Sequence, residues 1–202
     1  MPVETIFLVA LFAISMVGSP GPANMALMAS GARYGYSRSV PFLFGTLSGF
    51  LLVGIGVAAG VGTLFANFPA LRYTFLVFSA AYILFLAYKI AFQSTKPGEK
   101  KIEPRYLAGC IVHPLNPKAW VMLVAAFSQF MDPTGAQIVQ TMIILTVFTV
   151  TGLTLNSLWV FAGSLLTRFV SSPIVLQTIN RTLAILMIIV VAVAMLRSGI
   201  LG

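Results

Sequence analysis

Two short segments place prolines beside polar side chains inside otherwise apolar stretches. They are Ser19-Pro20-Gly21-Pro22-Ala23-Asn24 and His113-Pro114-Leu115-Asn116-Pro117-Lys118. Proline in a helix interior removes a hydrogen bond and clashes with the preceding turn, so each segment should break a helix. In hydrocarbon, the freed backbone groups must be satisfied by neighbours, water or a ligand. The matched pair therefore predicts a ligand cavity; the alternative is a plain kink in each of two packing helices.

Each break should also restart a helix. Asn116 followed by Pro117 has the residue types of an N-cap and a first helical residue, and either Ser19-Pro20 or Gly21-Pro22 could play the same part in the first segment. A helix N-terminus presents N–H groups and a positive dipole end, which suit a carboxylate. The chemistry to expect is anion binding, and the α-carboxylate of an amino acid is the obvious candidate.

Lys118 and His113 are the two titratable residues of these segments. Lys118 stands about a dozen residues into an apolar stretch, where a charge is costly and usually functional. It could pair with a substrate carboxylate or release a proton and couple transport to the proton gradient; the alternative is that it reaches the cytoplasmic surface. The imidazole of His113 changes charge near neutral pH, so it is a second candidate for proton coupling, or else a structural hydrogen-bonding group between helices.

The elements that must position these residues are membrane helices. Of the 202 residues, 59% are hydrophobic and only 8% charged, whereas soluble domains carry roughly a quarter charged residues. Six stretches are long enough to span a bilayer. They cover roughly residues 5–30, 40–64, 71–92, 106–130, 138–166 and 178–197. The predicted fold class is an all-α integral membrane protein with about six transmembrane helices, forming one transporter domain.

A polar, basic linker over residues 93–105 divides the chain into a first repeat, about 1–92, and a second, about 106–202. Three helices per half make the second half enter the membrane in the opposite sense, which predicts two inverted three-helix repeats. Lys and Arg collect at the first, third and fifth connections, and the opposite side has only Arg72 and Arg197. We therefore expect those three connections to face the cytoplasm and both termini to lie outside.

The sequence lacks the residues that several classes of function require. Cys110 is the only cysteine, so neither an intrachain disulfide nor a CxxC pair can form, and the scattered basic residues argue against nucleic acid as a partner. No ATP-binding or hydrolase motif is present, so we expect no enzyme activity, no metal and no cofactor. All four acids fall at helix ends or in loops: Glu4, Glu99, Glu103 and Asp132. A cationic substrate would require a carboxylate within the membrane to pair with its charged side chain, so neutral substrates fit better.

Two further features concern helix contacts. Gly45, Gly49, Gly56 and Gly60 lie on one face of the second segment, which favours close packing of helices and permits a homodimer. Asn156 in the fifth segment needs a polar partner in hydrocarbon, so it either joins two helices or contacts the substrate.

These motifs together resemble the LysE/RhtB family of amino acid exporters, over essentially the whole chain. The resemblance is carried by Ser19-Pro20-Gly21-Pro22, the glycine-spaced stretch from Gly31 and Gly35 through Gly45 and Gly49, and Asn116-Pro117-Lys118-Ala119. It implies export of amino acids such as threonine, homoserine, leucine or lysine across the bacterial inner membrane, driven by the proton motive force. It also implies functional positions at Pro20, Gly21, Pro22, Asn116, Pro117 and Lys118. The basic-substrate branch is similar to a pattern with an acid in the second helix, and residues 45–60 contain none, which favours the neutral, RhtB-like branch.

The hypothesis is a gradient-driven exporter of small neutral amino acids, whose partners are the amino acid, protons and the lipid bilayer. Its site would lie between the two proline breaks, where Lys118 holds the substrate carboxylate and Asn24, Asn116 and Asn156 are further candidates for contact. Two alternatives stay open: an inorganic-ion transporter of the same architecture, and a non-transporting membrane subunit whose glycine faces bind another protein.

Overall fold

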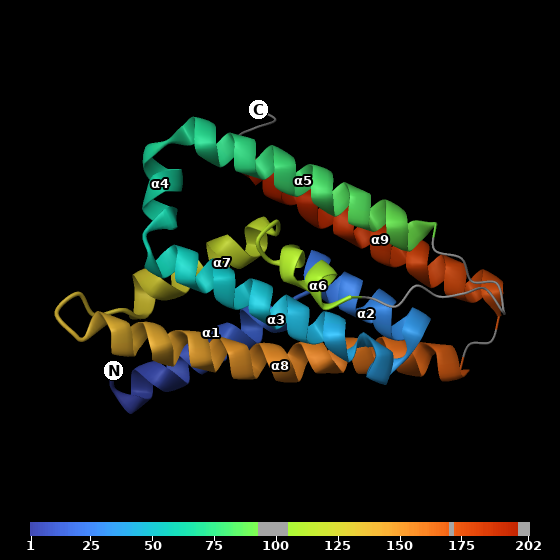
Figure 1. Cartoon of the computed structure of the whole chain (residues 1–202), viewed down its shortest axis with the longest axis horizontal. Helices are drawn as coiled ribbons and strands as arrows, with labels where there is room; N and C mark the ends of the chain where they lie inside the picture. The colour runs from blue at the N-terminus through green and yellow to red at the C-terminus, as the bar shows by residue number, and fades with distance from the viewer. Residues whose placement is uncertain (93–104, 170–171, 198–202) are drawn as a thin grey trace.

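The computed structural model describes residues 1–92, 105–169 and 172–197, and every regular element in these ranges is a helix. The predicted linker, residues 93–105, lies outside them except for Arg105. Figure 1 shows the helices, which are, in chain order, α1 (Val3–Gly18), α2 (Pro22–Tyr34), α3 (Tyr36–Ala58), α4 (Val61–Asn67), α5 (Pro69–Ala91), α6 (Tyr106–Val112), α7 (Pro117–Phe130), α8 (Gln137–Phe169) and α9 (Pro173–Arg197).

Four of these helices are long and apolar enough to cross a membrane unaided: α3, α5, α8 and α9. The pairs α1–α2 and α6–α7 pass the same test together, and each is bent by 61° at its break. Counting each bent pair as one span gives six spans. The predicted all-α membrane protein is thus confirmed, and both predicted helix breaks are present.

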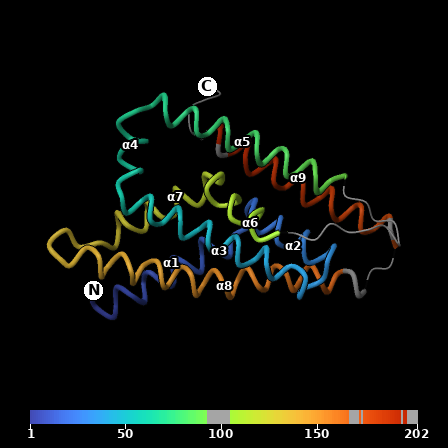
Figure 2. The backbone as a smooth tube through the Cα atoms, viewed as in Figure 1, coloured from blue at the N-terminus to red at the C-terminus, as the bar shows by residue number. Residues whose placement is uncertain are grey.

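The two halves of the chain repeat one order of elements: a bent pair, a long helix and a second long helix. In Figures 1 and 2, α1–α2 runs away from the end of the molecule that carries the N-terminus, whereas α6–α7 runs towards that end. The helices that follow also run in opposite senses, α3 towards the N-terminal end and α8 away from it. This is the arrangement that an inverted repeat requires.

Glycines set how closely the helices pack. A methyl group on Gly45 or Gly49 of α3 would run into the backbone carbonyls of Tyr106 and Cys110 on α6, so these two helices touch backbone to backbone. Gly31 of α2 meets α8 in the same way, through the carbonyl of Val160. The predicted packing role of the α3 glycines is therefore confirmed at Gly45 and Gly49. Because α6 of the same chain covers Gly45 and Gly49, these two glycines are not the contact surface of the homodimer that the glycine face would permit.

The second predicted segment, residues 40–64, is not one helix. Helix α3 ends at Ala58. Gly60 then takes a left-handed conformation with φ 89°, which favours glycine because a side chain is strained there. Gly60 is therefore a helix-terminating residue rather than part of the packing face. From it α4 turns across to the start of α5 at Pro69 (Figure 1).

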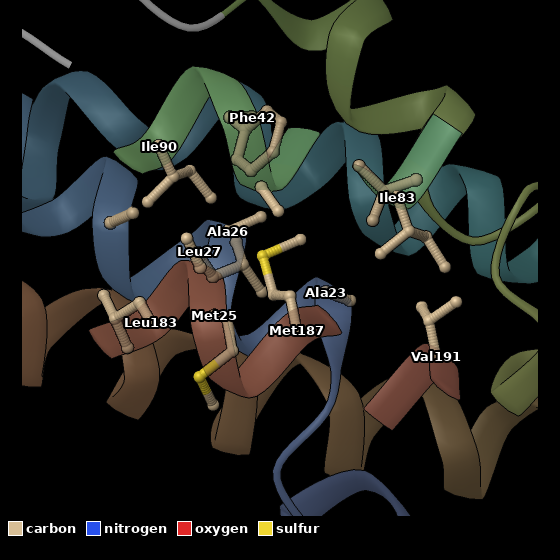
Figure 3. Packing of buried hydrophobic residues seen from close by; sticks show 14 of the residues in the cluster. Ala23, Met25, Ala26, Leu27, Phe42, Ile83, Ile90, Leu183, Met187 and Val191 are labelled. Atoms are coloured by element: carbon tan, nitrogen blue, oxygen red, sulfur yellow. The ribbon is translucent and has the colours of Figure 1, made fainter. Parts of the chain in front are cut away.

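Buried side chains form two apolar clusters. Figure 3 shows the first, where Leu27 of α2, Ile83 of α5 and Met187 of α9 pack together. The second lies among α1, α3, α7 and α8 and includes Leu123 and Phe148, both fully buried. Large apolar residues also cover much of the outside, which suits a chain whose surrounding solvent is lipid. Each bent pair contributes to both clusters, α2 and α6 to the first and α1 and α7 to the second.

Candidate functional site

The two breaks meet in space through Lys118. Its Nζ donates to the backbone carbonyl of Ser19 at 2.6 Å and to the Oγ of Ser19 at 2.9 Å. Ser19 belongs to the first break and Lys118 to the second, 99 residues away. The half-buried Lys118 side chain therefore points at the break in the other half of the molecule.

At the first break, side chains donate hydrogen bonds to the carbonyls at the end of α1 that the broken helix leaves without partners. The hydroxyl of Ser19 donates to the carbonyl of Met16 at 2.9 Å, and Nδ2 of Asn24 donates to that of Val17 at 3.2 Å. The helix resumes at Pro22 with Gly21 as its N-cap and without a side-chain cap. Of the two predicted cap pairs, Gly21-Pro22 is the one observed. The first turn of α2 thus keeps amide groups that no side chain caps.

Gly21 makes room for Lys118. A Cβ at Gly21 would lie 3.1 Å from Cδ and 3.2 Å from Nζ of Lys118, closer than ordinary van der Waals contact. The backbone of Gly21 is extended, with φ −165°, so the need for glycine comes from space rather than from conformation. Pro20, Gly21, Pro22 and Pro117 shape the breaks, and none of them lines the cavity described below.

The second break caps its own helix. Oδ1 of Asn116 accepts from the backbone N–H of Lys118 at 3.1 Å, and the carbonyl of Asn116 accepts from that of Ala119 at 3.0 Å. The predicted N-cap at Asn116, with Pro117 as first helical residue, is confirmed. Nε1 of Trp120 donates to the carbonyl of Pro114 at 3.0 Å. The expectation that both restarted helices offer free N–H groups therefore holds for α2 and is wrong for α7.

A cavity of about 30 Å³ lies where the breaks meet, with room for about two water molecules. Its polar lining comes from α2, from the break between α6 and α7, from α7 and from α8: Asn24, His113, Asn116, Lys118 and Asn156. Its apolar lining is Met16, Val17, Ala23, Leu47, Phe50, Ala119, Met122, Phe148 and Gly152. The sequence-predicted polar residues of the two breaks are thus brought to one place.

Asn156 fulfils the first of its two predicted roles, which is to join two helices, while contact with the substrate stays a prediction. Its Oδ1 accepts from Nδ2 of Asn24 at 3.4 Å, which joins α8 to α2, and its side chain also lines the cavity. Asn24 and Asn156 are 5% and 4% exposed, so the bond lies in a region where an unpaired amide would be costly.

His113 is 8% exposed and packs edge-on against the ring of Phe50, with 5.3 Å between ring centroids. Its Nδ1 is buried and, within the described part of the chain, has no hydrogen-bond partner. The interhelical hydrogen bond considered as its structural role is therefore not made through Nδ1. His113 stays a candidate for proton coupling.

Among the residues that the structure describes, Lys118 is the one charged residue in the cavity lining. Of the four acids, Glu4 and Asp132 lie near helix ends away from it, and Glu99 and Glu103 lie outside the described residues. The described ranges hold no group of three His, Cys, Asp or Glu side chains that could bind a metal. An anionic group is the complementary ligand for such a lining.

Ser19 and the aromatic lining are residues that sequence reasoning missed. Ser19 stands within the first motif, directly before Pro20, and a polar side chain at the end of a broken helix was the available signal. Phe50 and Phe148 are two phenylalanines among 16 in the chain. Their type therefore carries no signal that could separate them from the rest of the core.

Comparison with known proteins gives matches along most of the chain. The family model described as LysE type translocator matches residues 14–199, which include both breaks and every residue of the cavity lining. The cysteine/O-acetylserine efflux proteins of Escherichia coli (strain K12) and Shigella sonnei (strain Ss046) are each 30% identical to this chain over 152 residues. That match covers 74% of this chain and 77% of each relative. No solved structure matches.

Proposed function

Because the chain belongs to the LysE type translocator family, we propose that it exports small neutral amino acids or their derivatives from the cytoplasm across the bacterial inner membrane. The observation that carries the proposal is the position of Lys118, whose side chain lines the cavity and whose ammonium joins its own proline break to the other one, at Ser19. Relatives whose names state cysteine and O-acetylserine efflux support a substrate of this size and charge.

The substrate carboxylate has two complementary partners in the cavity. One is the ammonium of Lys118, which carries the only formal charge of the lining. The other is the uncapped N-terminus of α2, next to Gly21, where Ala23 and Asn24 line the cavity. Free amides at a helix N-terminus and a lysine ammonium are both groups that bind carboxylates. Together they favour an α-amino acid over an uncharged solute.

The lining also argues for a neutral side chain. A lysine or arginine substrate would bring a second cation beside Lys118, and no acid of the lining would offset the repulsion. Leu47, Phe50, Met122 and Phe148 provide apolar surface for a short side chain. Because the cavity is smaller than an amino acid, binding requires the halves to move apart, as alternating access between repeats would provide.

Export would be coupled to the proton gradient through Lys118, with His113 as a second candidate. Because the gradient drives protons inward, export requires exchange: the coupling group carries a proton inward on the empty carrier and gives it up when the amino acid binds from the cytoplasm. A lysine that binds the carboxylate as an ammonium keeps its proton, so His113 takes the coupling role if Lys118 holds the carboxylate. The position of both residues in the cavity lining supports this coupling.

The test is efflux from proteoliposomes that contain the purified protein and are loaded with labelled neutral, basic and acidic amino acids. The panel includes cysteine, O-acetylserine, homoserine, threonine and leucine, each measured with and without an imposed pH gradient. We expect gradient-stimulated efflux of at least one neutral member and none of lysine or arginine. The absence of flux for every member, together with copurification of a stoichiometric partner, would instead support a non-transporting subunit.

A further inference from the structure

Ser19 presents two oxygen acceptors to one ammonium group. Nζ of Lys118 donates to its carbonyl at 2.6 Å and to its Oγ at 2.9 Å. The hydrogen of that hydroxyl goes to the carbonyl of Met16 at 2.9 Å. A hydroxyl has one hydrogen, so towards Lys118 the Oγ can only accept. Both oxygens are therefore oriented as acceptors for a cation.

The fold fixes this pair of acceptors. Ser19 is the C-cap of α1, in extended backbone with ψ 138°, and Pro20 follows it. Since α2 begins only at Pro22, no N–H group of a continuing helix donates to the Ser19 carbonyl. The carbonyl is left for a donor from elsewhere, and Lys118 of the other half supplies one.

The group that these oxygens hold is a primary ammonium, which is also one of the two charged groups of every α-amino acid. The uncapped first turn of α2, suited to the other charged group, starts only three residues further along the chain. A zwitterion has its ammonium and carboxylate on one carbon atom, so both groups could find partners around this single break.

We propose that Ser19 is the subsite for the α-ammonium of the substrate, and that Lys118 holds this subsite as a tethered substitute when no amino acid is bound. The proposal rests on the proposed function in that the substrate is taken to be an amino acid. Two ammonium groups repel each other and cannot share the two oxygens. When the substrate binds, its ammonium takes Ser19, and Lys118 moves to the substrate carboxylate. Each charge keeps an oxygen partner or a cationic partner throughout.

This exchange makes the substrate replace a bond between the halves. Lys118 on α7 and Ser19 after α1 join the two breaks directly, and the substrate would take over that link. It also gives selectivity: a deamino acid or an N-acetyl amino acid has no ammonium with which to displace Lys118, so it should not be carried.

The first experiment removes the tethered ammonium and supplies a free one. Lys118→Ala protein, purified and placed in lipid nanodiscs, is titrated with ethylammonium, and binding is followed by calorimetry. We expect saturable binding to Lys118→Ala and none to the native chain. Tetramethylammonium, which has no N–H donor, should not bind. The double variant Lys118→Ala with Ser19→Ala should bind ethylammonium about tenfold more weakly, because one of two charge-assisted hydrogen bonds is lost.

The second experiment uses an otherwise native chain, so that it stands even if Lys118→Ala does not fold. Ser19→Ala should raise the half-saturating concentration of the transported amino acid about tenfold, and Ser19→Thr, which keeps the oxygen, should restore it. Ser15→Ala is the matched control, because the exposed hydroxyl of Ser15 bonds only within α1, to Leu11 at 3.0 Å. An equal effect of Ser15→Ala and Ser19→Ala would contradict the subsite.

The outcomes separate this inference from the function on which it rests. Amino acid efflux by the native chain, with no binding of ethylammonium to Lys118→Ala, overturns the subsite and leaves the exporter in place. Binding of ethylammonium to Lys118→Ala, in a protein that moves no amino acid, supports the ammonium subsite and overturns the proposed function.

Discussion

Lys118 occupies a position that its surroundings make costly. Its side chain is half-buried among apolar and amide groups, and the cavity lining offers no acid to balance its charge. The two oxygens of Ser19 meet the ammonium, but they are dipoles rather than a counter-charge. A lysine held in this way is poised to accept a carboxylate, and its cost is therefore best explained by ligand binding.

Replacing Lys118 with methionine should strongly reduce efflux at low substrate concentration while leaving the fold intact. Methionine keeps much of the apolar stem and removes the donor, and a charge-assisted hydrogen bond contributes about 1.5–3 kcal/mol, or about 10–150-fold in affinity. The measurement is gradient-driven efflux from proteoliposomes. Lys89→Met is the control, because Lys89 is exposed at the end of α5 and lies over the ring of Phe85. Unchanged efflux and unchanged pH dependence in Lys118→Met would remove Lys118 from the mechanism.

Gly21→Ala should weaken transport without unfolding the protein. The new methyl would meet the flexible end of Lys118 at 3.1–3.2 Å, so the lysine would shift away from Ser19 instead of the backbone moving. We expect reduced efflux with an unchanged thermal midpoint. Gly18→Ala tests whether any alanine in this region has the same effect, since its methyl would meet only Leu155, at 3.5 Å. Equal efflux of the two variants would show that the room beside Gly21 is not needed.

At the scale of single residues, the sequence could predict polar side chains in apolar surroundings and little else of the site. Lys118, Asn24, Asn116 and Asn156 were identifiable because each is expensive in hydrocarbon. Phe50 and Phe148 were not, because apolar residues are the rule in such a chain. Their place in the lining depends on which helices pack together, and the helix pattern alone does not fix this.

The helices are held together by backbone contact at glycines. Gly31 of α2 faces Val160 of α8, and Gly163 of α8 faces Met28 of α2, so the contact is reciprocal. Close backbone approach of this kind is a main source of helix association in membranes, where lipid tails are as apolar as the side chains. The reciprocal pair keeps α8 against the first bent pair and so holds Asn156 beside Asn24.

Gly31→Ala should destabilise the protein by about 1–3 kcal/mol, the usual cost of overpacking. The added methyl would overlap the carbonyl of Val160, which belongs to a helix backbone and cannot move aside as a side chain could. The measurement is thermal or denaturant unfolding in detergent. Gly18→Ala is again the matched control, and we expect its midpoint to stay close to that of the native chain. Equal midpoints for Gly31→Ala and Gly18→Ala would contradict the backbone contact.

At the scale of elements, the breaks were predictable and the end of α3 was not. Each break carries two prolines within four residues, which remove hydrogen bonds and clash with the preceding turn, so both bends could be located from the sequence. The single Pro41, near the start of α3, leaves that helix continuous. Residues 59–64 are apolar enough to continue α3, and only the left-handed conformation of Gly60 shows that the chain turns there. From the sequence alone, a glycine in a membrane helix is equally compatible with close helix packing and with the end of the helix.

The whole molecule has basic residues at one end of its spans. Arg33 and Arg38 lie near the junction of α2 and α3, Lys89 near the end of α5 and Arg105 directly before α6. The opposite helix ends carry Arg72 near the start of α5 and Arg197 at the end of α9, together with Glu4 and Asp132. The expectation that both termini lie outside rests on this asymmetry.

The opposite senses of the two halves could be predicted from a count of three helices in each. The meeting of their breaks could not be predicted, because it depends on long-range packing.

Cysteine labelling in intact cells tests the orientation. In a Cys110→Ala background, Thr134→Cys in the loop between α7 and α8 should react with a membrane-impermeant maleimide. Ser37→Cys at the start of α3 should react only after the cells are permeabilised. Both side chains are exposed, so accessibility depends on the membrane rather than on burial. The reverse pattern of labelling would place both termini in the cytoplasm.

The size of the cavity has a physiological consequence. About 30 Å³ holds water molecules but not an amino acid, so a substrate can bind only the fraction of molecules in which the breaks have separated. The apparent affinity is reduced by that fraction. On the proposed function, the half-saturating concentration of the amino acid is then higher than it would be for a site that is open in every molecule. Export would therefore respond mainly to a rise in the cytoplasmic concentration of the substrate.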